Sequence, residues 1–158
     1  AHAVSYGILE LAKKKPDLCI SGINYGENLG LSISCSGTIG AAFEADSYDI
    51  PSIAVSREAP LNIQHDSNFQ KMDWRIAKKI TSNLVYEVLE NGLPKGISIL
   101  NVNIPEEATY NTDIRITKQS RLNYSIFKKP EIRDFNIGYK LKSELDVNIE
   151  KTEKNSDV

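Results

Sequence analysis

Cysteine and histidine are scarce in this chain, which holds only two of each among its 158 residues. Cys19 and Cys35 are too few for a disulfide framework, and neither has the paired Cys/His spacing that a structural zinc site requires. His2 and His65 lie far apart in the sequence and match no nucleophile–base pattern. The sequence therefore predicts reduced thiols and a fold that depends on neither disulfides nor zinc.

A surplus of charge and a long apolar run are missing as well. The chain has 19 Lys and Arg residues against 21 Asp and Glu residues, which gives a formal net charge of −2. Such a balance creates no field that would hold a nucleic-acid backbone. No apolar stretch approaches the roughly 20 residues needed to span a bilayer. We therefore expect no nucleic-acid polymer and no membrane as a partner, and we expect a cytoplasmic protein.

The composition of 41% apolar and 25% charged residues is typical of one soluble domain with a sizeable core. Helical and strand patterns alternate along the first two thirds of the chain. They predict helices near residues 4–12, 37–45 and 69–91, and short buried strands at 18–20, 52–56 and 97–102. This alternation indicates an α/β fold with a three-layer, mostly parallel, doubly wound sheet that is Rossmann-like.

The pattern changes after Pro105. Ile114 and Ile116 alternate with polar residues, and the remainder of the chain has weak periodicity. We interpret residues 106–158 as an extended antiparallel arm that follows an α/β core of residues 1–105. Because extended segments with exposed edges tend to pair with another chain, the arm is also a candidate oligomerisation segment.

The residues that leave the first predicted strand are candidates for a ligand site, because ligands bind beyond the carboxyl ends of parallel strands. Gly22 lets the backbone turn sharply, and Asn24 offers a neutral carbonyl oxygen that can coordinate a hard cation. Gly26, Asn28 and Gly30 continue the loop. Composition alone favours a simple turn role for Asn24, so both interpretations stay open.

Ser36, Gly37 and Thr38 open the second predicted helix, and no Asp or Glu stands in its first turn. Unpaired backbone N–H groups and the helix dipole favour an anion at such an end. The absence of an acid beside two hydroxyl groups leaves room for a phosphate group. Ser36 also suits the role of N-cap, and periodicity does not separate the two roles.

Residues suited to catalysis are harder to find. Cys35 stands near a helix amino end, where thiolates are stabilised. A cysteine phosphatase would need an Arg after five intervening residues, and Ala41 occupies that place. Acids such as Glu27, Glu44 and Glu58 are not spaced as a general acid–base pair. The chain therefore offers ligands for a phosphate and a cation, but no clear acid or base.

Four segments of the chain, in the same order, resemble the survival protein SurE family of nucleotidases. They are residues 16–30, which contain Ser21-Gly22-Ile23-Asn24, residues 36–45, which begin with Ser36-Gly37-Thr38, and residues 50–56 and 100–105. The likeness is looser beyond Pro105, where residues 114–119 are its best part.

This resemblance implies an α/β core and the hydrolysis of nucleoside 5′- or 3′-monophosphates with a divalent cation, Mg²⁺ or Mn²⁺. It assigns Asn24 to the metal, and Ser36, Gly37 and Thr38 to the phosphate pocket. The second assignment agrees with the helix-end argument. Because the family exchanges C-terminal segments between subunits, the resemblance also implies a homodimer or tetramer formed through the arm.

The chain also departs from the family pattern. The family begins with a strand that leads to two adjacent Asp residues, and a Ser ligand follows; all three would precede Ala1. The chain opens on a helical pattern without an initiator Met, stops at Val158 where the family runs on, and has Cys35 where a Tyr is common. We therefore interpret it as a fragment, truncated at both ends, that lacks its N-terminal strand and carries no catalytic residue.

Such a fragment is expected to be inactive by itself. The alternative interpretation is a non-catalytic module that binds phosphate or a nucleotide, since the acid pair is missing from this chain.

Overall fold

The computed structural model describes residues 2–64, 68, 71–123, 125–133, 136, 141–145 and 152–158. His65, and Phe69 at the start of the third predicted helix, lie outside the described residues. The chain divides into two compact units. The first is Ala1–Asn28 with Ser34–Asp113, and the second is Leu29–Ile33 with Ile114–Val158.

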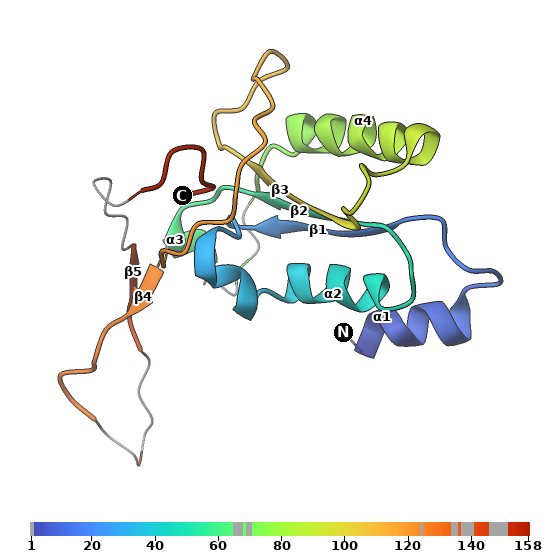
Figure 1. The fold of residues 1–158 in the computed structure, drawn as a ribbon. Helices are drawn as coiled ribbons and strands as arrows, with labels where there is room; N and C mark the ends of the chain where they lie inside the picture. The colour runs from blue at the N-terminus through green and yellow to red at the C-terminus, as the bar shows by residue number, and fades with distance from the viewer. Residues whose placement is uncertain are drawn as a thin grey trace. The chain divides into compact units, whose positions relative to one another are not determined.

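A parallel sheet of three strands forms the centre of the first unit (Figure 1). Its strands are β1 (Cys19–Tyr25), β2 (Ser52–Arg57) and β3 (Ile99–Ile104), in the spatial order β1-β2-β3. Every residue of β2 is buried, as expected for a middle strand that is covered on both faces. The three predicted strands are confirmed, and each continues further toward its carboxyl end than the pattern indicated.

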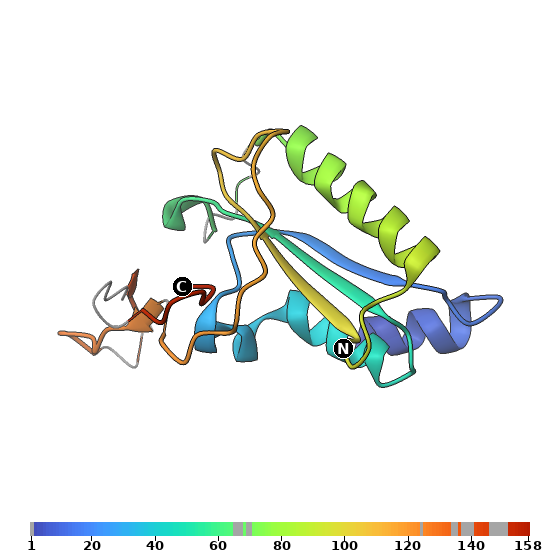
Figure 2. The same ribbon diagram turned by 45° about the horizontal axis from the view of Figure 1, so that its top comes forward.

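Helices cover both faces of this sheet (Figure 2). α2 (Gly37–Asp46) packs on one face against β1 and β2, whereas α4 (Arg75–Asn91) lies over β2 on the other face. α1 (His2–Tyr6) continues into a π-helical turn at Gly7–Leu11, and α3 (Leu61–Gln64) is one short turn. The three layers confirm the predicted α/β class. Among the described residues, no helix is both long and apolar enough to cross a bilayer.

The apolar core of this unit lies between the sheet and α4. Its buried members are Ile53, Val55, Ala77, Val88 and Ile104. On the opposite face, Ala42 and Ala45 of α2 have no exposed surface. Because these side chains are small, α2 lies close to the sheet, and its amino end is held at a fixed place relative to the strands.

The third helix begins later than residue 69, where the apolar pattern predicted its start. Residues 71–74 are not helical, and α4 begins at Arg75. Trp74 packs edge-on against Tyr25, with ring centroids 5.0 Å apart, and the Asp73 carboxylate accepts a hydrogen bond from the Arg75 N–H at 2.9 Å. Trp74 is the N-cap residue, and this aromatic contact and this hydrogen bond account for the start of the helix. The predicted end is confirmed, because α4 stops at Asn91.

β1 differs from the prediction of a strand covered on both faces. Ile20 is 48% exposed. β1 is the edge strand of the described sheet, and α4 lies over β2 rather than over β1. An edge strand is covered less completely than a middle strand, which explains the exposure of Ile20.

The described residues of the second unit include an antiparallel pair of strands, β4 (Ser125–Phe127) and β5 (Ser143–Leu145). Elsewhere in this unit, the Asp157 carboxylate accepts hydrogen bonds from the backbone N–H groups of Gly30 and Ser120. One carboxylate therefore ties residues near the C-terminus to two other segments of the same unit.

Ile114 and Ile116, whose alternation suggested the extended antiparallel arm, belong to no strand, so the arm stays a prediction at these residues. Their exposed fractions are 76% and 96%. Alternation of apolar and polar residues indicates a strand when one face of the strand is buried, and here neither isoleucine side chain is buried. The predicted boundary after residue 105 and the oligomerisation role of the arm stay predictions.

Candidate functional site

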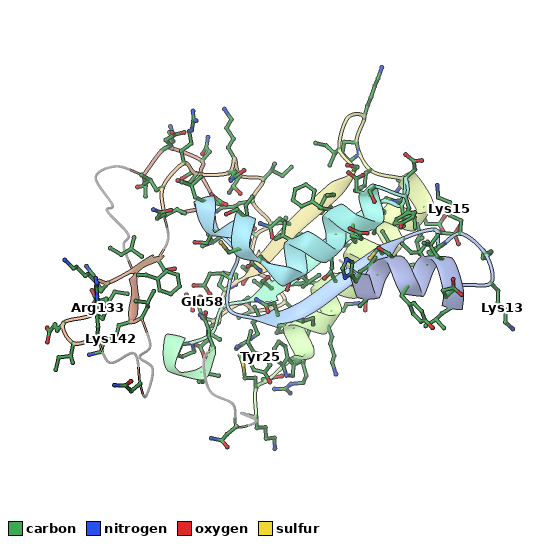
Figure 3. All side chains as sticks on the ribbon, turned by 90° about the horizontal axis from the view of Figure 1, so that it is seen from below. Lys13, Lys15, Tyr25, Glu58, Arg133 and Lys142 are labelled. Atoms are coloured by element: carbon green, nitrogen blue, oxygen red, sulfur yellow. The ribbon has the colours of Figure 1, made fainter. Side chains whose placement is uncertain are left out.

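The carboxyl ends of the three parallel strands lie at one edge of the sheet, and the loop after β1 leads from this edge to α2 (Figure 1). α2 begins at the same edge, as expected for a helix that connects two parallel strands. Figure 3 labels Tyr25 and Glu58 at this edge, while Lys13 and Lys15 lie at the opposite end of the unit. The edge is where sequence reasoning placed the ligand site.

Asn24 lies near the end of β1, where it pairs in register with Ser56 of β2. Its side-chain Nδ2 donates a hydrogen bond to the carbonyl of Gly26 at 2.8 Å. Its Oδ1 accepts no hydrogen bond from another described residue. The turn role and the ligand role of Asn24 are therefore compatible, since the first uses the amide donor and the second needs the amide oxygen.

Two glycines, one within β1 and one just after it, adopt positive φ angles that the backbone needs here. Gly22 has φ +122°, and a Cβ built on it would lie 2.2 Å from the backbone oxygen of Val55. Gly26 has φ +94°, and a Cβ there would lie 2.4 Å from the Gln64 side chain. The register of β1 against β2 also shifts between Ser21 and Asn24. Irregularities of this kind often re-aim side chains beside a functional site.

The amino end of α2 has the features expected of an anion site. Ser36 is the N-cap, and its Oγ accepts a hydrogen bond from the Ile39 N–H at 3.2 Å. No acid stands in the first turn. Within the described residues, the N–H groups of Gly37 and Thr38 donate to no protein acceptor. Ser36 therefore has the structural role considered from sequence, while two backbone donors remain for an anion.

Asn28 is the residue that sequence reasoning undervalued. It is 7% exposed, and its backbone N–H donates to Oδ1 of Asn103 at 2.8 Å. Its carbonyl accepts hydrogen bonds from Nδ2 of Asn101 and Nδ2 of Asn103, and its own Nδ2 donates to Oγ of Ser56 at 2.7 Å. The signal in the sequence was two Asn residues spaced by one within a buried strand, where apolar residues are usual.

Arg57 ends β2 and Glu58 follows it, and both side chains have structural partners. Arg57 is only 9% exposed, and its guanidinium donates to the carbonyls of Glu58 and Glu106. The Glu58 carboxylate accepts a hydrogen bond from the Glu106 N–H at 3.0 Å. Glu58 thus holds the loop after β3.

Cys19 does not have the setting of a nucleophile. Burial raises the pKa of the Cys19 thiol, and a hydrogen bond with Ser52 opposes that rise only in part. Cys19 is therefore a neutral thiol at neutral pH, as expected for a small apolar residue in a strand. Cys35 is exposed, and its sulfur lies 3.8 Å from the Ser34 hydroxyl oxygen.

The described residues fit one part of a divalent cation site. Such a cation prefers oxygen ligands, and Mg²⁺ normally takes one or two carboxylates with them. Oδ1 of Asn24 suits one position. In the part of the chain that the structure describes, no three His, Cys, Asp or Glu side chains gather where they could share a metal ion. Among the described residues, the edge therefore offers the Asn24 amide oxygen as a candidate cation ligand and two backbone N–H donors for an anion, beside no cluster of three metal-binding side chains.

Comparisons with known proteins identify relatives of this chain. The family model described as Survival protein SurE matches residues 1–126. The 5′-nucleotidase SurE of Methanothermobacter thermautotrophicus is 41% identical over 132 residues, which are 82% of this chain and 50% of the relative. The 5′-nucleotidase SurE of Methanocaldococcus jannaschii is 45% identical over 127 residues, which are 77% of this chain and 46% of the relative.

A solved structure is similar as well. The crystal structure of the SurE protein from Aquifex aeolicus has a TM-score of 0.70 and 31% sequence identity, and the match covers 98% of this chain and 58% of that chain. This chain spans about half the length of the curated relatives it matches. Because the family model covers most of the sequence and the fold agrees with that of a solved member, the chain belongs to the SurE family.

Proposed function

We propose that the complete protein is a metal-dependent phosphomonoester hydrolase that acts on nucleoside 5′- or 3′-monophosphates. The observation that carries the proposal is the open amino end of α2, with two unpartnered N–H groups among the described residues and no acid in its first turn. This end lies at the same sheet edge as Asn24, and curated relatives are named 5′-nucleotidase.

In this proposal, residues at the start of α2 bind the phosphoryl group. The N–H groups of Gly37 and Thr38 donate to phosphoryl oxygens, and the helix dipole adds positive potential there. The hydroxyl proton of Ser36 is available for a further bond, because its oxygen serves as the acceptor in the cap. These donors stabilise the charge that develops on the equatorial oxygens during transfer.

Asn24 is proposed as a ligand of the divalent cation, Mg²⁺ or Mn²⁺, through Oδ1. When bound, such a cation offsets phosphate charge and orients the phosphoryl group. The hydrogen bond from Nδ2 to the Gly26 carbonyl fixes the plane of the Asn24 amide, so Oδ1 points in a single direction. The carboxylates that complete the site are proposed to come from an adjacent Asp pair upstream of Ala1, and this chain alone is then inactive.

The test is an Asn24→Ala variant of the complete protein. Removing one metal ligand is expected to lower turnover of a nucleoside monophosphate by at least about 100-fold. Phosphate release is measured at several Mn²⁺ and Mg²⁺ concentrations, with adenosine 5′- and 3′-monophosphate as substrates. The matched control is Asn91→Ala, which removes an exposed amide that donates to Glu87 on α4. Undiminished turnover of Asn24→Ala would count against the proposal.

A non-catalytic nucleotide-binding module is the second candidate, favoured by the lack of a gathered acid cluster among the described residues. Calorimetry with a nucleoside monophosphate, with and without Mn²⁺, separates the two. Binding that needs no metal and releases no phosphate supports the module.

For partners, we propose a homodimer or tetramer that forms through residues 106–158. Several large apolar side chains of this segment are exposed, as expected of a surface that a second subunit covers. They are Ile114, Ile116, Phe127 and Ile132, whose exposed fractions are 76%, 96%, 73% and 81%.

A further inference from the structure

A row of polar residues crosses the sheet at its carboxyl edge. Asn24 of β1 pairs in register with Ser56 of β2, and Ser56 pairs with Asn103 of β3. Asn28, from the loop after β1, is bonded to the second and third members of this row. Ser56 has no exposed surface, so these bonds form away from water, where an unpaired partner would be costly.

The side chain of Asn103 binds Asn28 as a neighbouring strand would. Its Oδ1 accepts from the Asn28 N–H at 2.8 Å, while its Nδ2 donates to the Asn28 carbonyl at 3.1 Å. A backbone N–H only donates and a carbonyl only accepts, so the amide can face Asn28 in one orientation. Asn101 adds a second donor to the same carbonyl at 2.9 Å.

Asn28 lies four positions after Asn24 in the chain, and the loop between them contains Gly26, whose φ of +94° suits a turn. Within this segment Asn24 donates to the Gly26 carbonyl, and the Gly26 N–H donates to the Arg57 carbonyl of β2. Side chains of β3 bind both the N–H and the carbonyl of Asn28. The loop is therefore fixed in part by β3.

We propose that Asn103, with Asn101 in support, is a positioning residue that fixes the loop of residues 24–28 and thereby the amide oxygen of Asn24. The effect of Asn103 on turnover rests on the proposed function. Its effect on the position of the loop rests on the hydrogen bonds alone. A displacement of about 1 Å in a binding group can cost about 100-fold in rate, so a distant amide of this kind matters for turnover.

Three variants of the complete protein form a graded series. Asn103→Ala removes both bonds and is expected to lower kcat/KM by about 100-fold, mainly through kcat. Asn103→Asp keeps an acceptor for the Asn28 N–H but loses the donor to its carbonyl, and about a 10-fold loss is expected. Asn101→Ala removes only the second donor, so we expect a loss of less than about 3-fold.

The control must lose stability without touching the loop. Val88 lies in the buried cluster between α4 and the sheet, so Val88→Ala is expected to lower the melting temperature while leaving kcat/KM unchanged below it. If Asn103→Ala loses no more activity than Val88→Ala at matched fractions of folded protein, the kinetic part of the proposal is overturned.

A second readout needs no substrate. Hydrogen exchange of a peptide that covers residues 24–30 is expected to become at least about 10-fold faster in Asn103→Ala than in wild type or Val88→Ala. Unchanged exchange overturns the positioning role, whatever the enzyme assay gives. If exchange rises but the wild-type protein hydrolyses no nucleoside monophosphate, the positioning role stands and the proposed function fails.

Discussion

Glycine residues in the first unit stand in contrasting surroundings, although each lacks the same side chain. Gly22 needs its positive φ of +122°, and an added Cβ would collide with backbone at 2.2 Å. Gly40, inside α2, has open space where a Cβ would stand. At the first position the absence of a side chain is required by the fold, whereas at the second it only adds flexibility to the unfolded chain.

We predict opposite effects of alanine at these two positions. Gly22→Ala should destabilise the protein by about 2–4 kcal/mol, because both the positive φ and the Val55 backbone oxygen oppose a Cβ. Gly40→Ala should stabilise it by about 0.5–1 kcal/mol through helix propensity and reduced unfolded-state entropy. Urea unfolding of the two variants measures both signs, and a neutral Gly22→Ala would contradict the close approach of β1 to β2.

Among the helices and strands, α4 shows how a single carboxylate acts at the start of an element. The Asp73 carboxylate accepts hydrogen bonds from the backbone and the guanidinium of Arg75, at 2.9 Å and 2.6 Å. These bonds lower the pKa of Asp73 from 3.8 to about 2. The charged carboxylate of Asp73, which precedes the N-cap Trp74, therefore binds the first N–H group of the helix, and this contact is called the Asp73 cap below.

This cap predicts a specific acid sensitivity. The pKa of Asp73 is lower in the folded than in the unfolded chain, so its stabilising contribution is complete above about pH 4 and declines as the pH falls toward about 2. The pair is exposed, so the effect is small. Comparing urea midpoints of wild type and Asp73→Asn at pH 5 and near pH 2 should show a difference that is much smaller at the lower pH. A difference of the same size at both pH values would exclude this cap as its source.

At the scale of the whole molecule, the C-terminal arm is predicted to hold subunits together. We expect the complete protein to be a dimer or tetramer, and we expect replacement of residues 125–150 by a short Gly/Ser linker to yield monomers. This design retains Asp157, whose carboxylate contacts Gly30 and Ser120 in the second unit. Light scattering gives the mass of both proteins, and an unchanged mass would remove the oligomerisation role of this segment.

Local patterns in the sequence determined the α/β class, the three parallel strands and the end of α4 at Asn91. These depend on periodicity and on residues such as Gly92, which has φ +73° after the last helical turn. The candidates Asn24 and Ser36 were also readable from sequence, because each stands at the end of an element, where residue type has a direct chemical meaning. The sequence did not reveal which groups Asn24 and Ser36 contact in the folded chain.

Tertiary contacts decided the remainder. The start of α4 depends on Trp74 meeting Tyr25, the exposure of Ile20 depends on β1 being the edge strand of the described sheet, and both involve residues distant in the chain. The binding of Asn28 by Asn103 joins two residues 75 positions apart. A periodic pattern reports which face of an element is buried, but only the folded chain determines which amide meets which backbone group, because that depends on the packing of β1, β2 and β3 together.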